Sequence, residues 1–163
     1  MTTADDALIR PARPEDADAV VRLAGLLEAE EGTAGTCRLL PDHVRTCGFG
    51  AGRLFSVVVA ERDGGVVGYA LFYPSFDVTH AAKGLYLNDL YVLPAERGRG
   101  TGRALMRAVA RACVAEGGQY LFWNARASNA AARAFYGHLG AREEPVVTLA
   151  LHGEPLRRLV AAD

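Results

Sequence analysis

The chain has 163 residues and a formal net charge of −1, so it lacks the basic field that nucleic acid or an anionic membrane surface would attract. Half of its residues are hydrophobic, but no apolar run approaches the ~20 residues of a membrane-spanning helix. The acidic start lacks the apolar core of a signal peptide. Three cysteines without CxxC spacing predict reduced thiols in a cytoplasmic protein. We expect one soluble domain, residues 1–163.

Strand-like and helical patterns alternate along the chain, with proline, glycine and turn residues at their boundaries. The expected elements, in chain order, are a strand at 7–12, a helix from Pro14 to Gly32, a short helix from Pro41 to Gly48, a hairpin of 53–62 and 66–74 around Asp63-Gly64, a loop from Pro74 to Lys83, a strand at 84–93, a helix that opens after the glycines at 98–102 and runs to about Glu116, a strand at 119–125, a helix from Ser128 to His138, a strand at 146–151 and a short amphipathic tail. This order predicts an α/β fold around one mixed sheet.

The segment "ERGRGTGRALM" (residues 96–106) places three glycines directly before the helix that follows the 84–93 strand. A strand, a glycine loop and a helix in this order are typical of a phosphate held by backbone N–H groups. The Walker pattern fails because no Lys-Ser or Lys-Thr follows these glycines, and the GxGxxG pattern also fails. The pattern that fits is RxxGxG, at Arg97, Gly100 and Gly102. Residues 97–102 are called the glycine loop below.

This pattern resembles the acetyl-coenzyme A signature of the GNAT N-acetyltransferase superfamily, and the resemblance covers nearly the whole chain. "LYLNDLYVLPAERGRGTGRALM" resembles the fourth strand, glycine loop and third helix of that family, and "NAAARAFYGHLGARE" resembles its later Asn-to-Tyr helix. The details "IRPA", "LYLNDLYV", "WNARASNAAARAFY…LGA" and "GEPLRRL" resemble the diamine and polyamine acetyltransferase branch. The resemblance implies a mostly antiparallel sheet in which a splayed parallel strand pair holds acetyl-coenzyme A, with helices on its flanks.

Acetyl-coenzyme A is the cosubstrate that the resemblance implies, with its pyrophosphate at the helix N-terminus. The implied cofactor-binding residues are Leu90, Tyr91, Val92, Arg97, Gly98, Arg99, Gly100, Thr101, Gly102, Arg103, Asn129 and Ala132. The first three would contribute backbone groups to the pantetheine arm, and the N–H of Leu90 would polarise the thioester carbonyl. No His, Cys and Asp spacing suggests a metal.

The chemistry needs two proton transfers, because the acceptor amine must lose a proton and the departing thiolate must gain one. The resemblance assigns the second task to Tyr136. A glutamate of the "LYLED" segment handles the amine in the polyamine branch, but this chain has Asn88 there, and an amide cannot accept the proton. The neighbouring Asp89 would face the opposite side of the strand unless a bulge turns it. The substrate-binding candidates are Glu31, His80, Asn88, Asp89, Trp123 and Asn124.

The acceptor is expected to be the primary amine of a small molecule, either a diamine, a polyamine-like amine or an amino-acid-like amine. Two alternatives stay open at this point: a protein N-terminus or lysine as acceptor, and a non-catalytic module that senses acyl-coenzyme A. A homodimer is also expected, because the apolar strand at 146–151 would otherwise leave an exposed edge.

Overall fold

A computed structural model describes residues 7–161. The sequence predicts no signal peptide in the acidic start of the chain, and residues 1–6 of that start lie outside the described residues. The chain divides into two compact units, Met1–Asn129 and Ala130–Asp163, which are described separately. The elements of the first unit are β1 (Leu8–Pro11), the short 3-10 helix η1 (Pro14–Asp16), α1 (Ala17–Glu30), α2 (Pro41–Cys47), β2 (Ser56–Arg62), β3 (Gly65–Asp77), β4 (Ala82–Val92), η2 (Pro94–Glu96), α3 (Thr101–Ala115) and β5 (Tyr120–Phe122). The second unit holds α4 (Ala130–His138) and α5 (Glu154–Val160).

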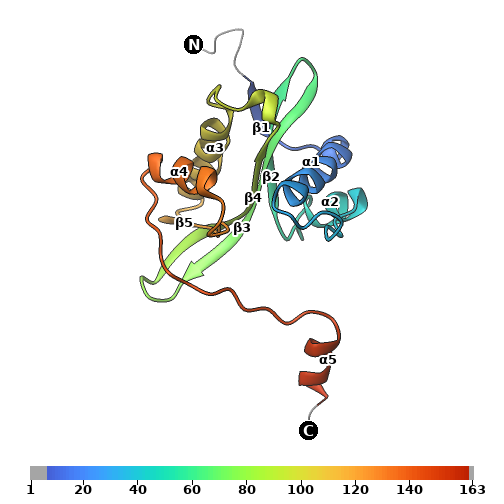
Figure 1. Ribbon diagram of the computed structural model, residues 1–163, viewed down its shortest axis with the longest axis vertical. Coiled ribbons are helices and arrows are strands. Elements are labelled where there is room, and N and C mark those ends of the chain that lie inside the picture. Colours follow the sequence, from blue (N-terminus) through green and yellow to red (C-terminus); the bar gives the residue numbers. More distant parts are fainter. Residues whose placement is uncertain (1–6, 162–163) are drawn as a thin grey trace. The chain divides into compact units, whose positions relative to one another are not determined.

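The first unit is built around a five-stranded sheet in the order β1-β2-β3-β4-β5. The first four strands pair antiparallel, whereas β4 and β5 run parallel. Helices α1 and α2 cover one face of the sheet and α3 covers the other (Figure 1). This arrangement confirms the predicted α/β class with one mixed sheet.

The alternation of side chains along the strands fills a core on each face. On the face of α1 and α2, Tyr69 and Leu71 of β3 pack with Val20 and Leu23 of α1. On the other face, α3 presents a buried stripe at helical spacing: Leu105, Met106, Val109 and Cys113. Both faces of the central strands are therefore apolar, which explains their continuous hydrophobic runs in the sequence.

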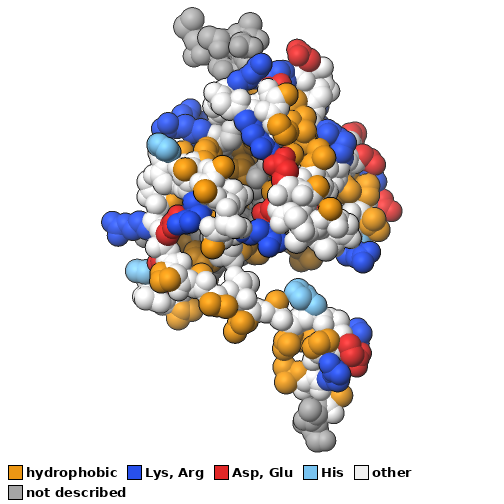
Figure 2. Space-filling view, viewed as in Figure 1, with side chains coloured by type: hydrophobic (Ala, Val, Ile, Leu, Met, Phe, Trp, Pro, Cys, Tyr) orange, Lys and Arg blue, Asp and Glu red, His pale blue; other side chains and the backbone are white. Residues whose placement is uncertain are grey.

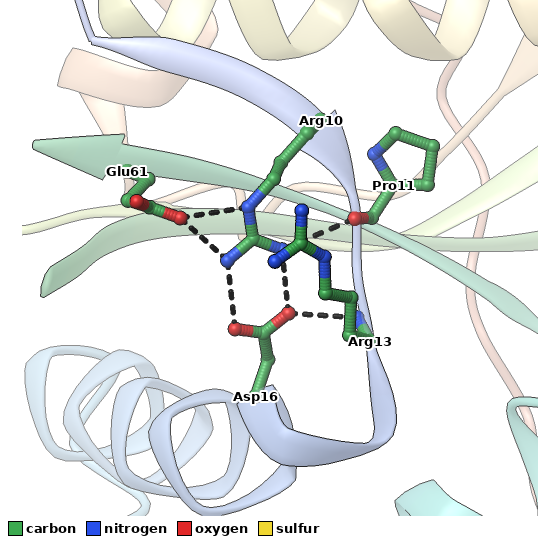
Figure 3. Close-up of polar contacts among 5 residues, drawn as sticks. All are labelled: Arg10, Pro11, Arg13, Asp16 and Glu61. Atoms are coloured by element: carbon green, nitrogen blue, oxygen red, sulfur yellow. Dashed lines mark hydrogen bonds and ion pairs between the residues drawn. The ribbon is translucent and has the colours of Figure 1, made fainter. Parts of the chain in front are cut away.

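An ion-pair network fixes α1 against the sheet (Figure 3). The guanidinium of Arg10 on β1 binds both oxygens of Asp16, at 2.7 and 2.9 Å, and also contacts Glu61 on β2 at 2.6 Å. Asp16 also accepts a hydrogen bond from the backbone N–H of Arg13 at 2.7 Å. The hydrogen bonds from Arg10 lower the pKa of Asp16 below its ordinary 3.8. The stabilisation is therefore complete above that value and is lost as the pH falls through the lowered pKa.

The prediction of a loop from Pro74 to Lys83 is wrong, because most of this segment belongs to a long β3–β4 hairpin. Pro74 pairs with Leu85, and only residues 78–81 form the turn. Pairing with β2 ends at Phe72, so β3 is an edge strand at Pro74 within the described part of the chain. Proline, which has no N–H to donate, is tolerated at such an edge.

The second unit differs from its prediction at residues 146–151, which form no strand in the structure. Figure 2 shows the hydrophobic side chains along this segment and α5. The large exposed hydrophobic residues of this unit are Val146, Val147, Leu149, Leu151, Leu156, Leu159 and Val160. The residues have strand-like character, but a strand forms only where a second strand pairs with it. Within the described residues none pairs with this segment.

Candidate active site

The glycine loop leads from η2 into α3, whose N-cap is Gly100. Gly98 and Gly100 have φ angles of +75° and +83°, in the left-handed region. A Cβ atom at either position would meet no protein atom within 4 Å. Among the described residues no side chain caps the start of α3, where Gly100 is the N-cap. The loop therefore offers uncapped backbone N–H groups and open space at two glycines, which suits an anion.

The side chain of Arg97 ties the glycine loop to α1. Its guanidinium binds both carboxylate oxygens of Glu30, at 2.9 and 2.8 Å, and its Nε donates to the carbonyl of Val92 at 2.8 Å. It also lies over the ring of Tyr91, whose hydroxyl donates to Glu30 at 2.6 Å. Burial acts to raise the pKa of Glu30, but these hydrogen bonds outweigh it and lower that pKa. In the structure the Arg97 side chain thus links α1 and β4 to the glycine loop. Its contact with the cofactor stays a prediction.

The other residues predicted to hold the cofactor in and beside the loop differ in burial. Arg99 and Arg103 are exposed, whereas Thr101 is buried and Gly102 is half-buried. The charged side chains are therefore available to an anion near the loop, while Thr101 anchors the start of α3 in the core.

Strand β4 has an open backbone edge next to the glycine loop. The β4–β5 ladder ends at Tyr86–Phe122, and no described strand continues it toward Val92. The N–H of Leu93 donates to Val67 on β3, so alternation directs the N–H groups of Leu90 and Val92 to the open edge. The backbone of Tyr91 faces β3, which does not favour the cofactor contact predicted there.

A bulge in β4 brings Asp89 to the face of the sheet that packs on α1. The register shifts between Phe72, which pairs with Leu87, and Leu71, which pairs with Asp89, so Asn88 is the extra residue. Because paired residues point to the same face, Asp89 shares the face of the core residue Leu71. The condition that the sequence left open for Asp89 is therefore met.

Asp89 is a half-buried carboxylate near other acids. Burial raises its pKa above the ordinary 3.8, and the negative charges of Glu31 and Glu28 raise it further. The hydroxyl of Tyr69 and the side-chain amide of Asn88 each donate to one carboxylate oxygen, at 2.7 and 2.9 Å, and act in the opposite direction. Glu28, Glu31 and Asp89 are called the carboxylate cluster below. Such a cluster attracts a cation, because a positive charge relieves the repulsion between the three acids.

Aromatic side chains of β3, β4 and β5 form a wall near Asp89. The rings of Tyr73 and Tyr86 stack at 5.1 Å, and that of Phe122 follows at 5.7 Å. Burial raises the pKa of both phenols, and the negative charge of Asp89 adds to this rise. Asn124, predicted to bind substrate, donates to the hydroxyl of Tyr86 at 3.0 Å. The structure thus brings Asn124 to the wall that borders Asp89.

Glu31, at the end of α1, is paired inside the chain. Its carboxylate contacts the guanidinium of Arg126 at 3.1 Å. Glu28, one turn earlier, accepts a hydrogen bond from the hydroxyl of Thr36. Both carboxylates therefore have side-chain partners within the chain and are not simply solvated.

His80, also predicted to bind substrate, lies in the β3–β4 turn. Its ring Nδ1 contacts Asp77 at 2.6 Å, and the same carboxylate accepts the backbone N–H groups of Thr79 and His80. About seven strand residues at ~3.3 Å each separate this turn from Asp89, roughly 23 Å. The structure does not bring His80 to the carboxylate cluster of the same chain.

Tyr136 and Ala132 belong to α4 in the second unit, where Tyr136 is half-buried and packs its ring 5.2 Å from that of Phe135. Trp123 and Asn129 are half-buried residues of the segment between β5 and α4. The roles of these four residues stay predictions. Among the described residues, no group of three or more His, Cys, Asp or Glu side chains is arranged to hold a metal.

The comparison with known families decides the class of the chain. Residues 22–141 match the family described as the Acetyltransferase (GNAT) family. The chain belongs to the GNAT acetyltransferase family. This confirms the resemblance that the glycine loop indicated.

Relatives and solved structures agree with this assignment. The chain is 30% identical to thialysine N-epsilon-acetyltransferase of Mus musculus, over 93% of this chain and 95% of the relative. It is 32% identical to L-ornithine N5-acetyltransferase NATA1 of Arabidopsis thaliana, over 47% of this chain and 34% of that protein. An integron cassette protein of V. cholerae has the same fold, with a TM-score of 0.79 at 23% identity over 95% of this chain and 98% of that one. The GNAT chain is therefore an N-acetyltransferase.

Sequence reasoning missed two residues of the candidate site, Tyr69 and Arg126. Tyr69 lies in an ordinary apolar strand, and Arg126 lies in the segment "WNARAS", where the family resemblance assigns it no role. The sequence carries no local signal for either, because each becomes relevant only through a distant partner, Asp89 or Glu31. One further finding is that no described helix combines the length and the apolar character needed to cross a membrane.

Proposed function

We propose that this enzyme transfers the acetyl group of acetyl-coenzyme A to a primary amine of a small basic molecule. The observation that carries the proposal is the bulge at Asn88. Asp89 follows the bulge and lies on the face that packs on α1, and the next residue, Leu90, has its N–H at the open edge of β4. Both positions lie a few residues before the glycine loop. One strand therefore connects a surface for a cation with a surface for an anion.

The glycine loop fits the pyrophosphate of acetyl-coenzyme A. Gly98 and Gly100 keep the space above the loop open, and α3 starts without a side-chain cap among the described residues. The N–H groups of residues 101–103 have no acceptor within the helix. These groups and the helix dipole would hold the phosphates, with Arg99 and Arg103 as exposed cations nearby.

The acceptor amine would bind at the carboxylate cluster. Asp89 attracts an ammonium group through its charge, and its raised pKa makes it a stronger base than an ordinary aspartate. Tyr69 holds one oxygen of Asp89 in place. We propose that the amine proton leaves toward Asp89, directly or through water, before the nitrogen attacks.

The bound thioester supplies an acetyl carbon that is open to attack by the neutral amine. The N–H of Leu90, directed to the open edge of β4, would stabilise the negative charge that develops on the carbonyl oxygen. As the C–N bond forms and the C–S bond breaks, the hydroxyl of Tyr136 would give its proton to the departing thiolate, and the second proton that the nitrogen loses would restore this hydroxyl through water. The products are an acetamide and free coenzyme A.

The relatives support an amine acceptor but leave its identity open. The names of two relatives refer to thialysine and ornithine, which both carry a side-chain amine. A second copy of the chain is part of the proposal as well. The exposed apolar segment 146–151 would pair in a homodimer. Cys37, Cys47 and Cys113 are free thiols, which supports a cytoplasmic location.

The test is release of coenzyme A from acetyl-coenzyme A with a panel of amines. The panel contains monoamines, diamines, spermidine, basic amino acids and a lysine-containing peptide. We expect turnover with small amines and none with the peptide. Acetyl-coenzyme A binding without turnover on any acceptor would instead support a sensor module, and turnover on the peptide alone would support a protein acceptor. Sedimentation of the protein at micromolar concentration tests the dimer, which a monomer would exclude.

A further inference from the structure

The ion pair between Arg126 and Glu31 lies at the edge of the carboxylate cluster. Arg126 follows β5, Glu31 follows α1, and 95 positions separate them in the sequence. The negative charge of Glu31 acts to raise the pKa of Asp89, so the two carboxylates are near enough to interact. A positive side chain of the protein therefore occupies a carboxylate that a cationic acceptor would use.

The Arg126–Glu31 pair has fewer contacts and is more exposed than the Arg10–Asp16 pair of the same unit. Arg126 contacts Glu31 through Nε alone, at 3.1 Å, and its side chain is 47% exposed. Arg10, by contrast, is 13% exposed and binds Asp16 with two nitrogens. An exposed single contact contributes little stability, so the Arg126–Glu31 pair exchanges partners at low cost.

We infer that Arg126 binds the α-carboxylate of a basic amino acid acceptor while Glu31 binds its α-ammonium group. The inference rests on the proposed function and specifies its acceptor. A guanidinium presents paired N–H donors that match a carboxylate, and the zwitterionic head group brings one charge for each partner. The side-chain amine of the acceptor then reaches toward Asp89.

The balance of charges explains why a polyamine is the poorer ligand. A zwitterion replaces one internal ion pair by two external ones and leaves no charge unpaired. A polyamine supplies only cations, so binding at Glu31 displaces Arg126 and leaves its guanidinium without a carboxylate in a cationic neighbourhood. The pair therefore selects for a carboxylate on the acceptor.

Three acceptors that differ only in the head group test this assignment. L-Lysine carries both groups, 6-aminohexanoate lacks the α-amine, and cadaverine (1,5-diaminopentane) lacks the α-carboxylate. We measure kcat and KM with saturating acetyl-coenzyme A for the wild type, Arg126→Gln, Arg126→Lys and Glu31→Gln. Arg45→Gln is the matched control, because Arg45 is a 40% exposed arginine that pairs with Asp18 and Asp42.

Arg126→Gln should lower kcat/KM for L-lysine and 6-aminohexanoate by roughly 10- to 100-fold, mainly through KM, and leave cadaverine unchanged or improved. Glu31→Gln should weaken L-lysine and spare 6-aminohexanoate. Arg126→Lys should restore part of the activity on L-lysine, and Arg45→Gln should change nothing.

Equal losses of kcat/KM on L-lysine and cadaverine in Arg126→Gln would overturn the inference, because they would show a structural role. A wild-type preference for cadaverine over L-lysine would also overturn it. Failure of the proposed function is distinguishable, since it appears as absence of coenzyme A release with every amine in the wild type.

Discussion

The glycine loop and the bulge of β4 are separated by less than ten residues, yet they build their surfaces by opposite means. The loop uses backbone N–H groups and keeps side chains away, as the empty space at Gly98 and Gly100 shows. The bulge uses side chains, since Asp89 is turned inward and held by Tyr69 and Asn88. The surface made of backbone depends on glycines, which leave out side chains that would cover the N–H groups. The surface made of side chains depends on the register in which β3 and β4 pair.

This difference implies that the two surfaces fail separately. Changes in the loop should act on the affinity for acetyl-coenzyme A, and changes at the bulge should act on the acceptor amine. Each of the following variants tests whether this separation holds.

The largest effect is expected at Tyr136, which lies outside both regions. If its hydroxyl protonates the departing thiolate, Tyr136→Phe should lower kcat by roughly 10²- to 10⁴-fold. Because neither surface is altered, the dissociation constant of acetyl-coenzyme A and the KM of the amine should stay near wild type. Steady-state kinetics measures kcat and KM, and calorimetry measures the dissociation constant of acetyl-coenzyme A. A kcat near that of the wild type would assign the proton to water or to another group.

Asp89→Asn should remove the charge of the acceptor surface while keeping its shape. We expect kcat/KM for the amine to fall by roughly 10²-fold, with unchanged binding of acetyl-coenzyme A. Because the pKa of Asp89 is raised, wild-type activity should fall on the acid side with an apparent pKa above the ~3.9 of an ordinary aspartate. The carboxylate is ionised above that pKa and protonated below it, so the variant should lose this acid limb. A variant with the same acid limb as the wild type would show that another group titrates.

Gly100→Val should weaken acetyl-coenzyme A by well over tenfold, because a side chain would stand between the backbone N–H groups and the pyrophosphate. Gly117→Val is the control for backbone strain, since Gly117 has a φ of +77° and equally empty surroundings at the other end of α3. Calorimetry should show weakened binding only in the loop variant. Equal affinity in both folded variants would contradict the assignment of the loop.

The smallest effect is expected at Asn88, where the polyamine branch has a glutamate. Asn88→Glu adds a negative charge beside Asp89 and should raise kcat/KM for spermidine several-fold relative to basic amino acids. Asn88→Gln, which has the same length without the charge, should leave the preference unchanged. If the wild type already prefers spermidine by tenfold or more, Asn88 does not determine selectivity.

The loop was predictable from the sequence because its signal is local. A strand, glycines and a helix follow one another, and α3 begins and ends where the pattern indicates. The same holds for α1, α2 and the β2–β3 hairpin, whose caps and turn residues lie inside each element.

The bulge was not predictable, because it is a property of two strands rather than of one. Whether Asn88 or Asp89 faces α1 depends on where β4 pairs with β3, and Tyr69 lies 20 residues earlier in the chain. The same reason explains the strand that the sequence predicted at 146–151. Alternating apolar residues give a segment the capacity to pair, but only a neighbouring strand makes it a strand.

The bulge has a consequence for how the enzyme changes through insertions and deletions. A substitution at position 88 alters one side chain, whereas loss of that position would restore the regular pleat. Leu87 and Asp89 would then be neighbours and would keep their partners Phe72 and Leu71, so Asp89 would stay on the face that packs on α1. A single-codon deletion at position 88 would therefore keep the acceptor carboxylate in place and remove only the side-chain amide that donates to it. The bulge is consequently a position at which this gene can lose a codon without moving Asp89 to the other face of the sheet.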